Sequence, residues 1–369
     1  MSDTAEREVA VASAQKLGLF DADIHPVPKS GTEIRSYLAP DWHGHFDHYR
    51  EFQRKPFANA NSYPRAVRAL SRRDSWPPGG GLPGSDLNFM REQHLDPYNI
   101  ECGVLQVLDP VGNKLRHPGF AAAMCSAIND WQALAWAEPE PRLKGSIIVP
   151  QEDTSAAIRE IERLGRSPLF RQIMISPRSE EPLGRPRYWP IYEAAEALGI
   201  SVTLHVGGEN GFPVTPAGHP SFFFEQRESH VPAAEAVLTS LILEGVIERF
   251  PRLRVITVEA GGIGWVPALS WRLDHCWERM GGEIPQVRKP PSSYLRSNFW
   301  FSSQPIDEPE KPEHLREVFD WVGWDRILFA TDYPHWDFDD PKYAVKFAMT
   351  PAEQQMFFRD NARTAFGLQ

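Results

Sequence analysis

The stretch LFDADIHPVP, residues 19–28, joins the apolar start of a β-strand to an ending made of acids, a histidine and two prolines. Proline cannot donate a hydrogen bond to a β-ladder, so the strand is expected to end near His25. Side chains two positions apart on a strand point to the same side, so Asp23 and His25 are expected to face one point while Ile24 packs the other way. Asp21 shares their parity but lies one step deeper, which makes it the weaker candidate. The stretch predicts a strand that presents an Asp-x-His pair at its carboxyl end.

The first strand is expected to begin at residue 17. Seven further strand-like runs follow it along the chain, and helical segments alternate with them. The runs are NIECGVLQVL (99–108), LKGSIIVP (143–150), FRQIMISP (170–177), ISVTLHVG (200–207), LRVITVEAG (253–261), SNFWFSS (297–303) and DRILFATDYP (325–334). Helical spacing covers residues 153–165, 187–198, 232–249, 264–280 and 311–321. Eight strands alternating with helices are typical of a (β/α)₈ barrel, the TIM barrel. A doubly wound sheet would place a glycine-rich turn after its first strand, where this chain has DADIHPVP.

Two segments interrupt the regular alternation. Residues 26–98 are rich in Pro, Gly, Arg and aromatic residues, and we expect them to form a cap over the mouth of a distorted barrel that spans residues 18–369. Residues 208–231 are expected to form a second long loop, and residues 1–17 a flexible amino-terminal segment.

Composition and charge narrow the classes of function. Of 369 residues, 41% are hydrophobic, enough for a substantial core, and the net charge of −10 comes without any long Lys/Arg cluster. We therefore expect no nucleic-acid partner, no membrane partner and a small-molecule substrate. No run approaches the roughly 18 apolar residues of a membrane span, and the amino terminus lacks the pattern of a secretion signal, which indicates a cytoplasmic protein. The three cysteines are widely spaced and predict neither a disulfide framework nor a zinc ribbon.

Acids and imidazoles recur where the predicted strands end. His205 lies late in the fifth strand, Glu259 late in the sixth, and Asp332 late in the eighth, followed by His335. The carboxyl ends of barrel strands meet at one rim, so these side chains are expected to surround one point together with the Asp-x-His pair. An ionisable group buried there needs a partner to offset its desolvation. The pattern predicts a shared metal site.

Mixed carboxylate and imidazole ligands suit Zn, Mn or Fe, and not an ion that demands thiolates. Three carboxylates and three imidazoles are available, with His230 as a further donor from the long loop, which exceeds the need of one catalytic zinc. The donor set therefore fits one ion or two. With open positions, an ion activates water or stabilises the charge of a chelated substrate. Glu259 is interpreted as a ligand or a base, and His335 as a residue that orients a ligand.

Other candidates carry weaker signals. Arg178, after the fourth strand, could pair with a substrate carboxylate through its planar guanidinium. His43, His45 and His48 could bring one imidazole from the cap, although local hydrogen bonds are the better explanation for most of them.

The residues DADIHP, LHVGG, FPRLRVITVEAGGIGWVPALSWRLD, ILFATDYPH and NARTAFGL resemble the amidohydrolase-related family that includes aminocarboxymuconate semialdehyde decarboxylase and the resorcylate and carboxyvanillate decarboxylases. The resemblance implies a TIM-like barrel, often dimeric, with a divalent ion at the strand ends. Carried over by position, it makes Asp23, His25, His205 and Asp332 metal ligands. The chain departs from the family by having Asp23 where several relatives have His or Glu, and Glu259 where many decarboxylases have histidine.

Three functions stay open from the sequence. The first is a metal-dependent hydrolase or non-oxidative decarboxylase acting on a small carboxylated or amide-like compound, with Glu259, His335 or His230 moving the proton. The second is a dinuclear Fe/Mn oxygenase on the same fold, motivated by Glu259 and the surplus donors. The third is a metal-binding partner subunit of an active homologue, and a homo-oligomer or such a complex is the expected assembly.

Overall fold

The computed structural model describes residues 17–52, 70–108, 117–206 and 222–368. The predicted flexible segment 1–17 lies outside the described residues except for its last position, and so do the middle of the cap and most of the second loop.

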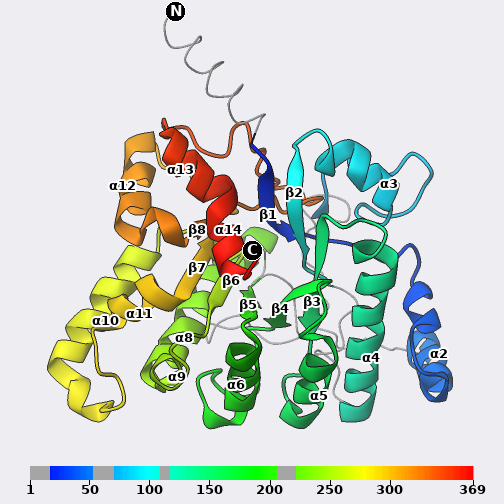
Figure 1. The fold of residues 1–369 in the computed structure, drawn as a ribbon, viewed down its shortest axis with the longest axis horizontal. Helices are drawn as coiled ribbons and strands as arrows, with labels where there is room; N and C mark the ends of the chain where they lie inside the picture. Colours follow the sequence, from blue (N-terminus) through cyan, green and yellow to red (C-terminus); the bar gives the residue numbers. More distant parts are fainter. Residues whose placement is uncertain (1–16, 53–69, 109–116, 207–221, 369) are drawn as a thin grey trace, which may run out of the picture.

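Eight parallel strands form the centre of the molecule, each hydrogen-bonded to the next in chain order (Figure 1). The first and the last strand of this order also lie side by side. The Ala22 N–H donates to the Phe329 carbonyl at 3.1 Å, and the Asp332 N–H donates to the Asp23 carbonyl at 3.1 Å. The predicted (β/α)₈ barrel is confirmed, with every strand inside its predicted run. The strands are β1 (Leu19–Ile24), β2 (Ile100–Leu105), β3 (Leu143–Ile148), β4 (Phe170–Ile175), β5 (Ser201–His205), β6 (Val255–Val258), β7 (Phe299–Ser302) and β8 (Ile327–Leu328).

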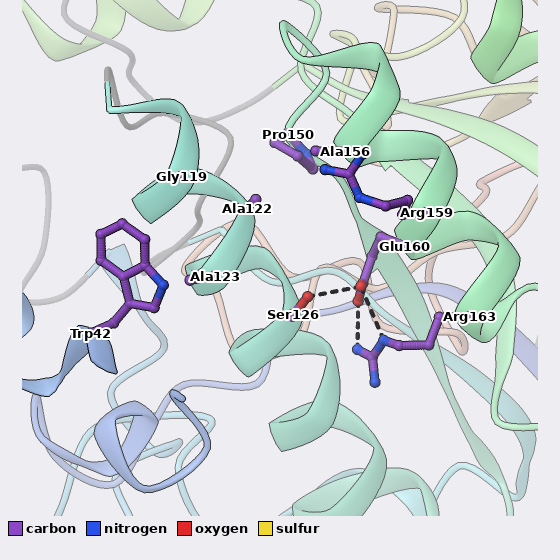
Figure 2. Close-up of a pocket in the computed structure, with 10 residues that line it drawn as sticks. All are labelled: Trp42, Gly119, Ala122, Ala123, Ser126, Pro150, Ala156, Arg159, Glu160 and Arg163. Carbon is purple, nitrogen blue, oxygen red and sulfur yellow. Dashed lines mark hydrogen bonds and ion pairs between the residues drawn. The ribbon is translucent and has the colours of Figure 1, made fainter. Parts of the chain in front are cut away.

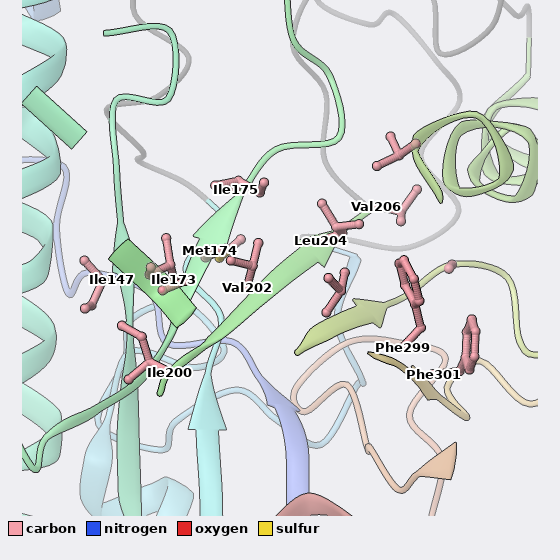
Figure 3. Packing of buried hydrophobic residues seen from close by; sticks show 14 of the residues in the cluster. Ile147, Ile173, Met174, Ile175, Ile200, Val202, Leu204, Val206, Phe299 and Phe301 are labelled. Carbon is pink, nitrogen blue, oxygen red and sulfur yellow. The ribbon is translucent and has the colours of Figure 1, made fainter. Parts of the chain in front are cut away.

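Alternate strand residues pack in two different environments. Ile173, Ile175, Val202 and Leu204 belong to the large apolar cluster that also includes residues of the surrounding helices (Figure 3). Polar residues of neighbouring strands hydrogen-bond to one another: the Gln172 amide donates to Ser146 Oγ at 2.6 Å, and Thr203 Oγ1, between Val202 and Leu204, donates to the side-chain carbonyl oxygen of Gln172. This period of two explains why these runs fold as strands although both faces are buried.

Helices surround the barrel (Figure 1). The predicted helices are confirmed within a few residues, except that the one expected over 232–249 begins earlier and is divided at Gly245, whose φ of 79° suits glycine. Helices α3, α4, α7, α11, α13 and α14 were not predicted. The helices are α2 (His43–Phe52), α3 (Leu87–Met90), α4 (Pro118–Trp131), α5 (Thr154–Leu164), α6 (Trp189–Leu198), α7 (Phe223–Glu228), α8 (His230–Leu243), α9 (Val246–Arg249), α10 (Val266–Met280), α11 (Pro291–Asn298), α12 (Pro312–Val322), α13 (Pro351–Gln355) and α14 (Asn361–Ala365).

Helix α14 lies across the amino-terminal ends of the strands. The Ala365 carbonyl accepts hydrogen bonds from Ser201, the first residue of β5, and from Arg254, just before β6. Ala362 and Phe366 join a second apolar cluster with residues of β1, β2, β6, β7 and β8. This end of the barrel is therefore filled by apolar side chains, and the polar strand ends lie opposite.

The described part of the cap packs against the end of β1. A π-helical turn, η4 (Arg91–Leu95), follows α3, and the Val27 N–H donates to the Gly84 carbonyl at 2.9 Å. Gly84 has a φ of 78°, and a Cβ placed there would lie 2.4 Å from the His25 carbonyl oxygen. Only glycine fits this close approach between the cap and the first strand.

Candidate metal centre

The predicted site residues meet at the carboxyl ends of the strands. His205 is the last residue of β5, Glu259 follows β6 and Asp332 lies shortly after β8. All three are buried, and so are Asp23 of β1 and His25, which follows β1. Glu259 and Asp332 have left-handed φ values of 51° and 63°. Such strained backbone is uncommon for residues other than glycine and clusters at functional sites.

Four of these side chains form one compact cluster. His25 Nε2 lies 3.0 Å from Asp23 Oδ1 and 2.8 Å from Asp332 Oδ1. His205 Nε2 lies 3.7 Å from Asp23 Oδ2, and the rings of His25 and His205 meet edge to face with centroids 5.2 Å apart. Residues distant in sequence thus point their possible ligand atoms at one small volume.

The cluster contains buried polar atoms that lack a hydrogen bond of good geometry. Both oxygens of Asp23, Nε2 of His25 and both ring nitrogens of His205 make no hydrogen bond of good geometry within the described part of the chain, although His25 Nε2 lies close to two carboxylate oxygens. Leaving one such atom unpaired costs about 1–3 kcal/mol, so several together call for a shared partner. Carboxylate oxygens and imidazole nitrogens are suitable ligands for a divalent transition metal, and the residues present therefore fit such an ion.

The pKa values of Asp23 and His25 also favour a cation at the centre of the cluster. Burial acts to raise the pKa of Asp23, but the charges of His25 and His205 outweigh it and hold the pKa well below its usual value. Burial acts to lower the pKa of His25, and Asp23 and Asp332 outweigh that effect and raise the pKa well above its usual value. The cluster therefore favours positive charge at its centre. Because metal ligands must be deprotonated, an ion there would replace the proton of His25, and its binding is expected to weaken at low pH.

The backbone fixes the orientation of His25. Its Nδ1–H donates to the carbonyl oxygen of Gln106 at 2.7 Å, which leaves Nε2 to face the two carboxylates. A ligating histidine is commonly held in this way by a hydrogen bond to its other ring nitrogen.

Asp21, the weaker candidate from the sequence, is not part of the groups of possible ligand atoms among the described residues. The pairing of β1 with β2 is irregular between Asp21 and Ile24. The Asp21 carboxylate instead accepts hydrogen bonds from the Thr331 N–H at 2.9 Å, Thr331 Oγ1 at 2.6 Å, the Asp23 N–H at 3.1 Å and His94 Nε2 at 2.8 Å. Asp21 thus connects the backbone beside Asp23, the residue before Asp332, and the cap.

A second acidic group lies beside the first cluster. Oxygens of Glu259, Asp332 and Asp337 all lie within 4.8 Å of one another. Gln304 donates through Nε2 to Asp332 Oδ2 at 3.1 Å and to Asp337 Oδ2 at 3.0 Å, and Arg227 forms ion pairs with Glu259 and Asp337. The sequence analysis missed Arg227, Gln304 and Asp337. The signal for Asp337 was its place in the same polar strand end as Asp332, whereas Arg227 and Gln304 gave none.

Glu259 combines a buried carboxyl with charged neighbours. Its Oε2 lies 3.6 Å from His205 Nε2 and its Oε1 lies 3.5 Å from the Arg227 guanidinium. Burial, and then the negative charge of Asp332, raise the pKa of Glu259 to about 7. A carboxyl group that changes its protonation state near neutral pH is suited to accept or donate a proton.

The remaining predicted residues lie around this centre. His335 Nδ1 lies 2.6 Å from Asp332 Oδ1, and its ring stacks on His25 with centroids 4.3 Å apart. His230 is the first residue of α8 and not part of a loop as predicted; burial and the nearby charge of Arg227 lower its pKa to about 3. Arg178 is half-buried after β4, and its charge also acts to lower the pKa of His230.

His43 and His45 of the cap make local contacts, as expected for most of the cap histidines. His43 Nε2 hydrogen-bonds to the Leu38 carbonyl at 2.9 Å, and the ring of His45 packs against Trp42 and Phe120. The imidazole that the cap does bring near the centre is His94, which the sequence analysis did not single out.

A cavity of about 320 Å³ lies away from the centre, on the outside of the barrel. Trp42 faces Gly119 and Ala122 of α4 across it, and residues of α5 line the other side (Figure 2). Glu160 accepts hydrogen bonds there from Ser126 at 2.8 Å and from Arg163 at 2.6 Å, so its carboxylate is already satisfied. The cavity contains none of the predicted site residues.

Among the helices of the described residues, none has both the length and the apolar composition needed to cross a bilayer.

Comparison with known proteins finds decarboxylases among the relatives of this chain. The chain is 26% identical to gamma-resorcylate decarboxylase of Polaromonas sp. over 301 residues, which cover 77% of this chain and 88% of that protein. It is 25% identical to 2-amino-3-carboxymuconate-6-semialdehyde decarboxylase of Dictyostelium discoideum over 251 residues, 66% of each chain.

The fold has matching solved structures. The crystal structure of 5-carboxyvanillate decarboxylase from Novosphingobium aromaticivorans, complexed with manganese and 4-hydroxy-3-methoxy-5-nitrobenzoic acid, superposes with a TM-score of 0.70 at 18% identity, over 96% of this chain and 97% of that one. The sequence profile described as "Amidohydrolase" matches residues 20–368. The resemblance found in the sequence is thus confirmed, and the chain belongs to the amidohydrolase family.

Proposed function

We propose that this protein is a metal-dependent carboxy-lyase that removes CO₂, without oxidation, from a small aromatic acid with a hydroxyl group next to its carboxyl group. The observation that carries the proposal is the cluster of Asp23, His25, His205 and Asp332, whose buried ligand atoms face one another and include several that make no hydrogen bond of good geometry in the described residues. The decarboxylases among its relatives support the choice of decarboxylation over hydrolysis.

The four side chains of the cluster would hold a divalent ion. When bound, that ion supplies positive charge that stabilises the carboxylate and the neighbouring oxygen of the substrate. We propose manganese, in line with the manganese in the carboxyvanillate decarboxylase structure, while zinc and iron also suit the ligand types.

Glu259 is the residue we assign to proton transfer. In the reaction the ring carbon that bears the carboxylate accepts a proton, the bond between this carbon and the carboxylate breaks, and its electron pair returns to the ring as CO₂ leaves. No oxidant is needed. Because the pKa of Glu259 is raised to about 7, its carboxyl is partly protonated near neutral pH and can supply that proton from Oε1 or Oε2.

Neighbouring residues would position the reacting groups. His335 hydrogen-bonds to Asp332 and stacks on His25, so we assign it to holding these two in place. The low pKa of His230 keeps its ring neutral, which allows it to hydrogen-bond to a substrate hydroxyl group. We assign Arg178, with its planar guanidinium, to a substrate carboxylate or phenolate oxygen.

We further propose that the protein acts in the cytoplasm on a small molecule, as a homo-oligomer, without nucleic-acid or membrane partners. The oxygenase and the partner-subunit hypotheses are ranked lower, since the relatives named above are decarboxylases and the cluster provides a centre of its own.

The test is an anaerobic assay of CO₂ release. Metal-free protein reloaded with Mn²⁺ is incubated with 2,6-dihydroxybenzoate and related hydroxybenzoates, and CO₂ and the decarboxylated phenol are measured. We expect equal amounts of both, with loss of activity in Asp332→Asn. Asp339→Asn is the matched control, because this acid lies in the same segment but accepts from the Ile306 N–H, outside the ligand groups. Absence of CO₂ across the panel, or turnover that requires O₂, would contradict the proposal.

A further inference from the structure

Three carboxylates, one of them the proposed metal ligand Asp332, create a strongly negative volume. Oxygens of Glu259, Asp332 and Asp337 lie within 4.8 Å of one another. The side chains of Glu259 and Asp337 are only 9% and 10% exposed, so water screens their repulsion poorly. Such a group needs a compensating positive charge, and carboxylates at this spacing can bind a second divalent ion next to the first.

The structure places a side-chain cation at this position. The guanidinium of Arg227 lies 3.5 Å from Glu259 Oε1 and forms an ion pair with Asp337 Oδ2. Its side chain is 16% exposed, and its guanidinium carbon lies 5.2 Å from the centre of the Trp336 ring. Helix α7 carries Arg227, while Trp336 and Asp337 come from the strand end after β8. Pairing and stacking together fix the guanidinium over the acidic group.

Gln304 completes the arrangement. Its amide donates to Asp332 Oδ2 and to Asp337 Oδ2, at 3.1 and 3.0 Å. Asp337 is therefore engaged by both a guanidinium and an amide, and the oxygen of Asp332 that does not face His25 is engaged by the same amide. A second ion would have to remove these donors and lie within a few Å of a fixed positive charge.

We propose that Arg227 is a built-in counter-ion that takes the place of a second metal ion, so that the centre binds a single divalent ion although its donor set is large enough for two. Arg227 is a positioning residue in this role, because it acts through Glu259 and Asp337. The inference rests on the proposed function only in that it needs a divalent ion at the first cluster, and it does not depend on the substrate.

The test counts Mn²⁺ ions. Metal-free full-length chains are titrated with Mn²⁺, free ion is followed by electron paramagnetic resonance, and bound metal is measured by elemental analysis. The wild type is expected to bind one ion per chain. Arg227→Met keeps the length of the aliphatic chain but removes the charge, and it is expected to bind two. The two ions, about 3.5–4 Å apart as in two-metal sites, would show magnetic coupling.

Two further variants sharpen the result. Arg227→Gln keeps amide donors toward Asp337 without the charge and is also expected to bind two ions, which secures the test if the methionine variant does not fold. Arg316→Met is the matched control, because Arg316 also pairs with two carboxylates, those of Asp320 and Glu353, and lies 5.0 Å from the Trp324 ring. It is expected to bind one ion.

Several results would overturn the inference. Two ions or none in the wild type contradict it, and so does a single ion in both Arg227 variants. One ion in the wild type and two in the variants, without any CO₂ release by the wild type, would support the role of Arg227 and refute only the proposed function.

Discussion

Replacing Asp21 with asparagine is expected to weaken both the fold and the metal site, although Asp21 is not a proposed ligand. Its Oδ1 accepts from the N–H groups of Asp23 and Thr331, and its Oδ2 accepts from Thr331 Oγ1 at 2.6 Å and from His94 Nε2 at 2.8 Å. In Asp21→Asn the amide oxygen can keep the first two hydrogen bonds. The amide nitrogen then faces two donors.

The magnitude follows from the two lost hydrogen bonds. A hydrogen bond to a charged group contributes about 1.5–3 kcal/mol, so both together contribute about 3–6 kcal/mol. Part of this is recovered, because the Thr331 hydroxyl can rotate to accept from the amide and the His94 proton can move to Nδ1. We expect the free energy of unfolding to fall by about 3 kcal/mol. Because the neighbours of Asp23 and Asp332 shift, the affinity for Mn²⁺ is expected to fall about 10- to 100-fold, as for other residues that orient metal ligands.

Urea unfolding and chelator competition for Mn²⁺ measure the two effects. Thr331→Val removes one of the two hydrogen bonds to Oδ2 and also the acceptor of the Tyr333 N–H, and it is expected to cost about 2 kcal/mol or more. Equal Mn²⁺ affinity in wild type and Asp21→Asn, with or without a loss of stability, would refute the argument that Asp21 positions the ligands.

Three other substitutions have defined outcomes. Glu259→Gln is expected to lower kcat by about 10²- to 10⁴-fold with little change in Mn²⁺ affinity, since it removes the proton donor; an unchanged kcat would exclude that role. Hydrogen bonds from Arg142 lower the pKa of Glu140 from 4.5 to about 2; burial opposes this shift and hydrogen bonds from Arg91 add to it. The contribution of Glu140 to stability is therefore present above pH 4.5 and is lost as the pH falls toward 2. Glu140→Gln should remove about 2 kcal/mol at pH 7 and flatten this acid dependence in urea unfolding, and equal pH profiles of the two proteins would contradict the assignment. Gly84→Ala should lower the free energy of unfolding by about 2 kcal/mol or more, because its Cβ would lie 2.4 Å from the His25 carbonyl oxygen. Gly80→Ala is the control and should cost only about 1 kcal/mol, because Gly80 has a similar φ but no atom within 4 Å of the added Cβ. Equal losses in the two variants would show that the contact with His25 does not matter.

The barrel could be predicted because its strands are short, largely apolar runs bounded by turn residues, a pattern that depends on local sequence. The division of the predicted helix at Gly245 could not be predicted, because a single glycine is also tolerated inside a helix. Helix α4 was missed because its sequence, PGFAAAMCSAINDW, is apolar on most of its surface and shows little helical periodicity.

The convergence of Asp23, His25, His205, Glu259 and Asp332 was predicted from strand ends, because barrel topology brings those ends together whatever the spacing in sequence. Asp21 was the weaker candidate because it lies one step deeper in the strand, and its hydrogen bonds to Thr331 and to His94 of the cap could not be predicted from that position.

The contacts of Arg227, Gln304 and His94 follow from how loops and cap pack on the barrel, and no local pattern encodes that packing. Their partners are separated from them along the chain, as His94 is from Asp21 and Gln304 is from Asp332.

The most direct test of the central claim is the anomalous difference density of a crystal grown with Mn²⁺. The account predicts one strong peak bounded by the carboxylates of Asp23 and Asp332 and the Nε2 atoms of His25 and His205, with ligand distances of about 2.0–2.5 Å. A fully loaded crystal with no peak there, or with its peak at another group of residues, would contradict the account.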